Sequence, residues 1–260
     1  MIHPTAIIDP DARLGEGVEV GPYAVIGPKV SIGDGSTVGP HAIIESNVRM
    51  GKNNRISPFA SIGAPPQDLK FKGEDTWVEI GDNVVVREYA TINRGTATGV
   101  GTTRVGNNCM IMAYCHVAHD CQVGNRVIMA NAATLAGHIE IEDGAFIGGL
   151  TGVHQFVKIG TLAMIGAQSG VSQDVPPYVK AVAMRQGRNR SLFGLNVIGL
   201  QRAGFSPETI GTLKKAYRIL FNGEMPMREA LDRAEAEVEP IPEVKHLIGF
   251  VRSSKRGVLR

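Results

Sequence analysis

The sequence has few aromatic residues, little net charge and no long uncharged apolar run. Aromatic side chains make up 5% of the 260 residues, so a large core has to be built from aliphatic side chains. The formal net charge is only +2, and we expect no nucleic-acid partner. The stretch that comes nearest to a membrane span, residues 144–173, is rich in glycine and interrupted by Lys158. We therefore expect no membrane insertion.

Cysteine is also scarce, which excludes a disulfide-rich scaffold. Cys109, Cys115 and Cys121 are six residues apart and share one position of the repeat described below, so we interpret them as small apolar core residues. We expect neither a metal nor a cofactor. Free thiols suit a reducing compartment. Because the repeat already begins at Ile2, we expect no signal peptide and a cytoplasmic protein.

What the sequence does have is an aliphatic residue at every sixth position. The period covers residues 2–62, returns at 80–92 and continues over 105–171. It matches neither the helical period nor the two-residue alternation of a flat strand, and is typical of hexapeptide repeats that coil into a parallel β-helix. The repeated positions are Ile2, Ile8, Leu14, Val20, Ile26, Ile32, Val38, Ile44, Met50, Ile56, Ile62, Ile80, Val86, Ile92, Val105, Ile111, Val117, Val123, Met129, Leu135, Ile141, Ile147, Val153, Ile159, Ile165 and Val171.

Two further positions of each unit agree with such a coil. Glycine often follows the aliphatic residue, and we expect it to provide a positive φ at the corners. The fourth residue after the aliphatic is small or β-branched, as in Ala24 and Val30, which suits a narrow core. Three units make one triangular coil, so residues 18 apart stack about 4.8 Å from one another. The repeat predicts roughly eight or nine coils.

Interruptions of the period organise the chain. Residues 64–78 and 94–104 break it and are expected to leave the column as outward loops. The repeat ends before Pro176 and Pro177, which cannot donate to a strand ladder. Helical patterns follow, expected over about 206–222, 226–239 and 242–253.

These patterns predict a mainly β fold with two domains. Residues 1–179 form a parallel β-helix and carry 12 Lys/Arg against 17 Asp/Glu, a balance of −5. Residues 180–260 form a small α-helical C-terminal domain with 15 Lys/Arg against 8 Asp/Glu, a balance of +7. A basic domain of this kind indicates an acidic partner.

Histidines gather in one part of the repeat. His119 and Gly137 are 18 residues apart, so they lie one coil apart on the same face, with His138 beside them and Gln155 two coils from His119. Asp120 can orient the imidazole of His119. A histidine base, a carboxylate and a glycine amide together suit acyl transfer, in which the base accepts a hydroxyl proton and the amide stabilises an oxyanion. A zinc site held by histidines is the rival interpretation.

Several longer motifs resemble one family, the UDP-N-acetylglucosamine O-acyltransferases of lipid A biosynthesis. The resemblance extends over the whole chain. The matching motifs are Ala118-His119-Asp120-Cys121, Leu135-Ala136-Gly137-His138, Val153-His154-Gln155-Phe156, Gln67-Asp68-Leu69-Lys70, Asn93-Arg94-Gly95-Thr96, Gln173-Asp174-Val175-Pro176-Pro177-Tyr178, Gly199-Leu200-x-Arg202 and the closing Arg256-Gly257-Val258-Leu259-Arg260.

The resemblance implies a fold, a reaction and a set of roles. It implies a cytoplasmic homotrimer of left-handed β-helices, with active sites between subunits, that transfers a 3-hydroxyacyl chain from acyl carrier protein to the 3-hydroxyl of UDP-N-acetylglucosamine. His119 would be the general base, Asp120 its partner and Gly137 the oxyanion donor, while Ala167 would limit the length of the acyl chain. The residues implied in substrate binding are Asp68, Lys70, His116, His138, His154, Gln155, Asn196 and Arg202. Candidates for docking the carrier protein are Arg185, Arg188, Arg190 and Arg202.

The chain also departs from the family pattern. Asn93, Ile198 and Ala203 stand where the family commonly has histidine, glutamate and a basic residue, and the segment 183–190 is about four residues longer. Two alternatives stay open: a related transferase that uses a 3-amino nucleotide sugar, and a non-catalytic or zinc-binding hexapeptide-repeat protein. A third alternative is an N-acyltransferase of the same pathway. The N-acyltransferase usually carries an additional N-terminal domain, whereas here the repeat starts at Ile2, so we do not expect that alternative.

Overall fold

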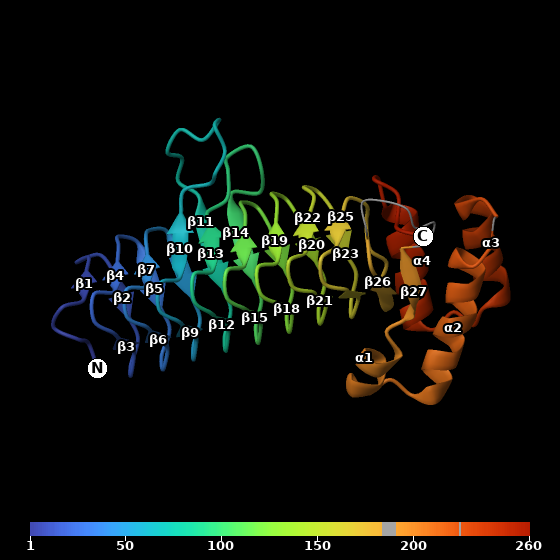
Figure 1. Ribbon diagram of the computed structural model, residues 1–260, viewed down its shortest axis with the longest axis horizontal. Coiled ribbons are helices and arrows are strands. Elements are labelled where there is room, and N and C mark those ends of the chain that lie inside the picture. Colours follow the sequence, from blue (N-terminus) through green and yellow to red (C-terminus); the bar gives the residue numbers. More distant parts are fainter. Residues whose placement is uncertain (184–190, 224) are drawn as a thin grey trace.

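The protein is a long column with a group of helices at one end (Figure 1). The computed structural model describes residues 1–183, 191–223 and 225–260. Three parallel sheets extend along the column, and each coil contributes one short strand to each sheet. This arrangement is a left-handed parallel β-helix of hexapeptide repeats and confirms the predicted fold class.

The strands are short and stack in register. In most coils the paired residues are 18 apart, as in Ile8 and Ile26. Sheet 1 contains β1 (Ile7–Ile8), β4 (Val25–Ile26), β7 (Ile43–Ile44), β10 (Ser61–Ala64), β13 (Thr91–Asn93), β16 (His116–Val117), β19 (Thr134–Leu135), β22 (Gly152–Val153) and β25 (Gly170–Val171). Sheet 2 contains β2 (Arg13–Leu14), β5 (Val30–Ile32), β8 (Val48–Met50), β11 (Trp77–Ile80), β14 (Thr102–Val105), β17 (Gln122–Val123), β20 (Glu140–Ile141) and β23 (Lys158–Ile159). Sheet 3 contains β3 (Glu19–Val20), β6 (Thr37–Val38), β9 (Arg55–Ile56), β12 (Val85–Val86), β15 (Met110–Ile111), β18 (Ile128–Met129), β21 (Phe146–Ile147), β24 (Met164–Ile165), β26 (Val179–Ala181) and the antiparallel β27 (Leu192–Leu195).

The core of the column consists of the repeated aliphatic residues and the small residues four places later. Ile26, Ile44 and Ile62 are at most 1% exposed, and Ala24 and Ala42 are fully buried. The cysteines occupy the same small-residue position and are buried and free. Burial raises the pKa of Cys109 and Cys115 to about 11 and that of Cys121 to about 12, so these thiols stay protonated at neutral pH.

The expectation of positive φ at the glycines was wrong. The left-handed residue of each corner lies three places after the aliphatic residue and is usually not glycine, as in Asn53 and His138. The glycine directly after the aliphatic is required instead for close stacking: a Cβ on Gly27 would lie 1.7 Å from the carbonyl oxygen of Glu45. Its small size therefore permits the close approach of adjacent coils.

Both long loops leave the column along the edge between sheets 1 and 2 (Figure 1). The first connects β10 to β11 and the second connects β13 to β14. The side chain of Asn93 joins them by donating a hydrogen bond to the carbonyl oxygen of Pro65. Two separate breaks in the period therefore produce neighbouring loops on one edge.

Four helices follow the column: α1 (Val197–Arg202), α2 (Pro207–Phe221), α3 (Met227–Glu237) and α4 (Pro242–Ser253). Ser206 caps α2 as expected, since its side chain accepts a hydrogen bond from the amide of Thr209. The short α1 was not anticipated. The domain boundary at residue 179/180 stays a prediction. Strand β26 extends across this position and continues sheet 3. None of the described helices is long and apolar enough to cross a membrane.

Candidate active site

We call the row formed by His119, Gly137, His138 and Gln155 the histidine stripe. It lies on the edge between sheets 1 and 2, the same edge that carries the two loops. The amide of His138 donates to the carbonyl oxygen of His119, one coil away, over 3.0 Å. The two rings meet edge to face with centroids 4.9 Å apart, and the ring of Phe156 stacks on His138 at 4.6 Å. The coil geometry therefore places three aromatic side chains from successive coils in one row.

Asp120 is the buried acceptor of this group. Its carboxylate is 2.9 Å from Nδ1 of His119 and fully buried. The second loop surrounds it: the hydroxyl of Thr96 donates over 2.6 Å, and the amides of Thr96 and Gly101 donate over 3.1 Å. Since a carboxylate only accepts, Nδ1 of His119 carries the proton and Nε2 is left as the basic nitrogen. The arrangement suits a general base.

The pKa shifts agree with this protonation pattern. Burial alone would raise the pKa of Asp120, but hydrogen bonds from Thr96 and His119 outweigh it and hold that pKa below its usual value. Burial lowers the pKa of His116 and of His138, and the nearby His119 lowers both further, although Asp120 opposes the shift at His138. His116 and His138 are therefore neutral at pH 7 beside an ionised Asp120.

Gly137 lies directly against the ring of His119. A Cβ on Gly137 would be 2.4 Å from Cε1 and 2.7 Å from Nε2 of that imidazole. The residue is buried, and within the described part of the chain its amide has no hydrogen-bond acceptor. This N–H is therefore available to a ligand. The imidazole of His119 and the amide of Gly137 are thus adjacent.

A groove of about 820 Å³ extends from this edge across the outer face of sheet 1. Its lining begins at His119 and Gly137 and continues to the opposite edge of the sheet. The lining residues are Gln67, His116, Ala118, His119, Thr134, Leu135, Ala136, Gly137, Gly152, Val153, His154, Gln168, Ser169, Gly170, Val171 and Ser172. A larger concavity of about 1010 Å³ on sheet 2 is lined by ion-paired residues such as Glu79 and Arg104 and is separate from the stripe.

Most of the substrate-binding candidates lie near this groove. His116 and His154 line it, and Nδ1 of His116 is 2.7 Å from the hydroxyl of Thr91. Asp68 lies in the first loop, where its carboxylate accepts a hydrogen bond from the amide of Lys70 over 3.0 Å, and its charge raises the pKa of His138 slightly. Lys70 in the same loop is exposed, and so is Gln155 at the edge.

Three candidates lie elsewhere in the same chain. Asn196 caps α1, and its side chain donates to the carbonyl oxygen of Leu162 over 2.9 Å, on the edge between sheets 2 and 3. Arg202 is exposed in the last turn of α1. Ala167 lies at the corner between sheets 3 and 1, next to the groove residue Gln168. A single chain therefore does not bring Asn196 or Arg202 to the stripe. Arg185, Arg188 and Arg190 lie outside the described residues.

Sequence reasoning missed several residues that shape the site. Thr96 and Gly101 hold Asp120, and Gln67, Thr134 and Ser172 line the groove. The motif around Thr96 was visible in the sequence, but a loop outside the period offers no register that would pair it with Asp120. Thr134 and Ser172 could have been found, because they lie on the outer face of sheet 1 in register with His116 and His154.

Comparisons with known proteins identify the family of the chain. A family model described as UDP N-acetylglucosamine O-acyltransferase, domain 2, matches residues 174–259, and a model for bacterial transferase hexapeptide repeats matches 29–64 and 102–137. Relatives named acyl-[acyl-carrier-protein]–UDP-N-acetylglucosamine O-acyltransferase from Janthinobacterium sp. (strain Marseille) and Thermodesulfovibrio yellowstonii are 51% and 52% identical, with 100% of this chain and 99% of each relative covered. The solved UDP-N-acetylglucosamine acyltransferase of Bacteroides fragilis has a TM-score of 0.95 at 45% identity, with both chains covered completely. With this likeness over its whole length, the chain belongs to the acyl-[acyl-carrier-protein]–UDP-N-acetylglucosamine O-acyltransferase family.

Proposed function

We propose that the protein transfers a 3-hydroxyacyl chain from acyl carrier protein to the 3-hydroxyl of UDP-N-acetylglucosamine in the cytoplasm, as the first step of lipid A biosynthesis. The observation that carries the proposal is the pairing of two groups that have no hydrogen-bond partner among the described residues: Nε2 of His119, whose ring is oriented by Asp120, and the amide of Gly137 beside it. The names of the relatives supply the substrates.

The geometry suggests how the reaction proceeds. Nε2 of His119 accepts the proton of the sugar hydroxyl while the hydroxyl oxygen forms a bond to the thioester carbonyl carbon. The carbonyl oxygen becomes an oxyanion and accepts a hydrogen bond from the Gly137 amide. When the oxyanion collapses, the carbon–sulfur bond breaks, and the imidazolium returns its proton to the departing thiolate. Asp120 stabilises the imidazolium between these steps.

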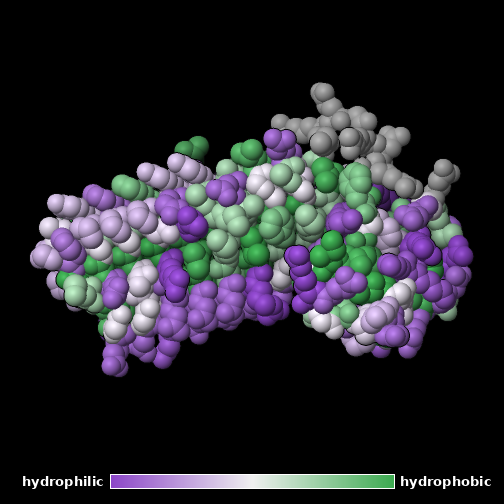
Figure 2. Space-filling model, turned by 60° about the horizontal axis from the view of Figure 1, so that its bottom comes forward, coloured by the Kyte–Doolittle hydropathy of each residue, from purple (hydrophilic) through white to green (hydrophobic). Residues whose placement is uncertain are grey.

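We further propose a homotrimer, because part of the outer face of sheet 3 and one corner of the column carry apolar side chains. The outward residues of sheet 3 include Val85, Met110, Ile128 and Phe146, which are only partly buried in one chain. Figure 2, with the underside of Figure 1 turned forward, shows apolar residues along the column. On the corner between sheets 3 and 1, five rings stack at 5.1 Å and are largely exposed: Tyr23, His41, Phe59, Tyr89 and Tyr114. Contiguous exposed apolar side chains mark contact surfaces.

A threefold arrangement would complete the site. If the ring-bearing corners meet at the axis, sheet 3 of one subunit faces sheet 1 of the next and covers its groove, in a head-to-tail contact that closes into a ring. The edge that holds Asn196 would then lie beside the neighbour's edge that holds His119. Ala167 would lie at the axial end of the groove, across sheet 1 from the base. This packing accounts for the separation of the candidate residues within one chain.

The zinc interpretation has one observation in its favour, since the potential ligand atoms of His119, Asp120 and His138 lie within 4.8 Å of one another. The Oδ2 atom of Asp120, however, already accepts from the Thr96 hydroxyl and from His119. Both of its lone pairs are therefore engaged, and acyl transfer fits the group better.

One turnover experiment tests the proposal. Purified protein is incubated with 3-hydroxyacyl carrier protein and either UDP-N-acetylglucosamine or its 3-amino analogue, and thiol release and acylated sugar are quantified. We expect transfer to the 3-hydroxyl. Transfer only to the amine would establish the alternative acceptor, and a folded, zinc-loaded protein without turnover would overturn the enzymatic proposal. Sedimentation at assay concentration tests the trimer, which an active monomer would refute.

A further inference from the structure

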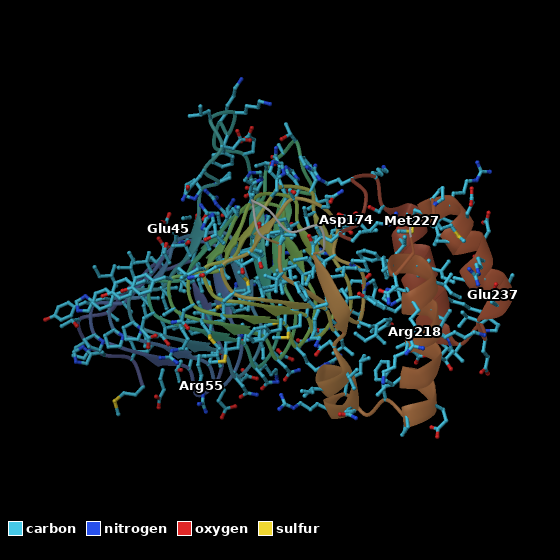
Figure 3. All side chains as sticks on the ribbon, turned by 45° about the vertical axis from the view of Figure 1, so that its right-hand side comes forward. Glu45, Arg55, Asp174, Arg218, Met227 and Glu237 are labelled. Carbon is cyan, nitrogen blue, oxygen red and sulfur yellow. The ribbon has the colours of Figure 1, made fainter. Side chains whose placement is uncertain are left out.

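The closing motif of the chain returns to the end of the column. Buried Asp174, labelled in Figure 3, anchors it. The amide of Asp174 donates to the carbonyl oxygen of Gly257, the amide of Leu259 donates to the carbonyl oxygen of Asp174, and the Ser254 hydroxyl donates to its carboxylate over 2.6 Å. Gly257 has φ +73°, so a glycine suits this turn. Three attachments therefore hold the backbone on both sides of Arg256.

Arg256 extends from this tail to a groove residue. One of its guanidinium nitrogens, Nη2, is 3.2 Å from Nδ1 of His154, which lines the groove two coils from His116. No carboxylate pairs with Arg256 among the described residues. Its cationic N–H donor is therefore directed at a histidine rather than used in an ion pair.

The same ring nitrogen has a second neighbour that requires the opposite proton position. The carbonyl oxygen of Gln155 is also 3.2 Å from Nδ1 of His154. Gln155 can accept only if Nδ1 carries a proton, whereas Arg256 can donate only if Nδ1 does not. The two interactions therefore select different tautomers. A charged donor forms a hydrogen bond about twice as strong as a neutral one, so the contact with Arg256 prevails.

We propose that Arg256 is a positioning residue that holds His154 in the tautomer with its proton on Nε2. His154 then offers an N–H donor to what binds in the groove instead of a bare nitrogen. The consequence for catalysis rests on the proposed function, but the tautomer itself does not.

Long-range ¹H–¹⁵N NMR of protein labelled with ¹⁵N-histidine tests the proposal, because the two neutral tautomers give different coupling patterns. The signal of His154 is assigned with His154→Gln. We expect the Nε2–H pattern in the wild type, a shift toward Nδ1–H in Arg256→Ala and retention of Nε2–H in Arg256→Lys, which keeps a charged donor. Lys255→Ala is the matched control, because it removes an exposed positive charge from the same tail.

Kinetics provide the second readout. Arg256→Ala should lower kcat/KM about three- to tenfold, the scale of one hydrogen bond, with an unchanged thermal transition. Arg256→Lys should recover most of the loss. An Nδ1–H pattern in the wild type, or an unchanged pattern in Arg256→Ala, refutes the proposal; a changed tautomer with unchanged kinetics refutes its role in substrate binding. Because the NMR readout needs no substrate, failure of the proposed reaction would be seen separately.

Discussion

Substitution of Gly137 by alanine should displace the base without removing the oxyanion donor. The new Cβ would lie 2.4 Å from Cε1 of His119, whereas carbon atoms in contact are about 3.5 Å apart, so the imidazole has to retreat by about 1 Å. Such a shift disturbs the 2.9 Å hydrogen bond to Asp120. Misplacement of a catalytic group by about 1 Å lowers the rate roughly 100-fold, and we expect that loss in kcat. The Gly137 amide itself remains.

A double-mutant cycle with His119→Ala makes this reasoning refutable. His119→Ala alone should lower kcat by about 10²–10⁴ while the thermal transition and the trimer persist, because the side chain lies outside the core. If Gly137→Ala acts through the imidazole, it should have no further effect in the His119→Ala protein. Gly249→Ala is the control, since nothing lies within 4 Å of its new Cβ. Near-normal turnover of Gly137→Ala, or additive losses in the double variant, would show that the groups do not act together.

Three further outcomes are expected. Ala167→Met should favour shorter acyl donors by at least tenfold, since each excluded methylene is worth about 0.8 kcal/mol; an unchanged profile across donors of graded length would remove Ala167 from the end of the groove. The hydrogen bond from His246 to Glu142 raises the pKa of His246. Burial would raise the pKa of Glu142, but the hydrogen bonds from His246 and Thr161 outweigh burial and lower that pKa. The stabilisation contributed by His246 is present below the ordinary pKa of histidine and lost as pH rises through the raised value, so His246→Gln should lower Tm more near pH 6 than near pH 9; equal losses would contradict the linkage. Finally, the KM for carrier protein should rise with salt and with Arg202→Glu, and a KM insensitive to both would argue against electrostatic docking.

The neighbourhood of His119 was predictable because a repeat converts sequence separation into distance. Residues 18 apart stack whatever their side chains, so the placement of His119 against Gly137 and His138 follows from counting. The same counting put the cysteines in the core. It failed for the glycines, because the period shows where small residues recur but not whether φ or close approach requires them.

The six-residue period alone determined the column, its register and the edge on which the histidines lie, because every coil repeats the same backbone pairing. Where the period stops, only the tertiary structure decided which segments lie together. The loop that surrounds Asp120, the edge to which Asn196 is joined and the return of Arg256 to His154 depend on contacts between segments of unrelated spacing. Such contacts follow from side-chain packing and hydrogen bonding in three dimensions. Outside the repeat, the separation of two residues in the sequence does not give their distance in space.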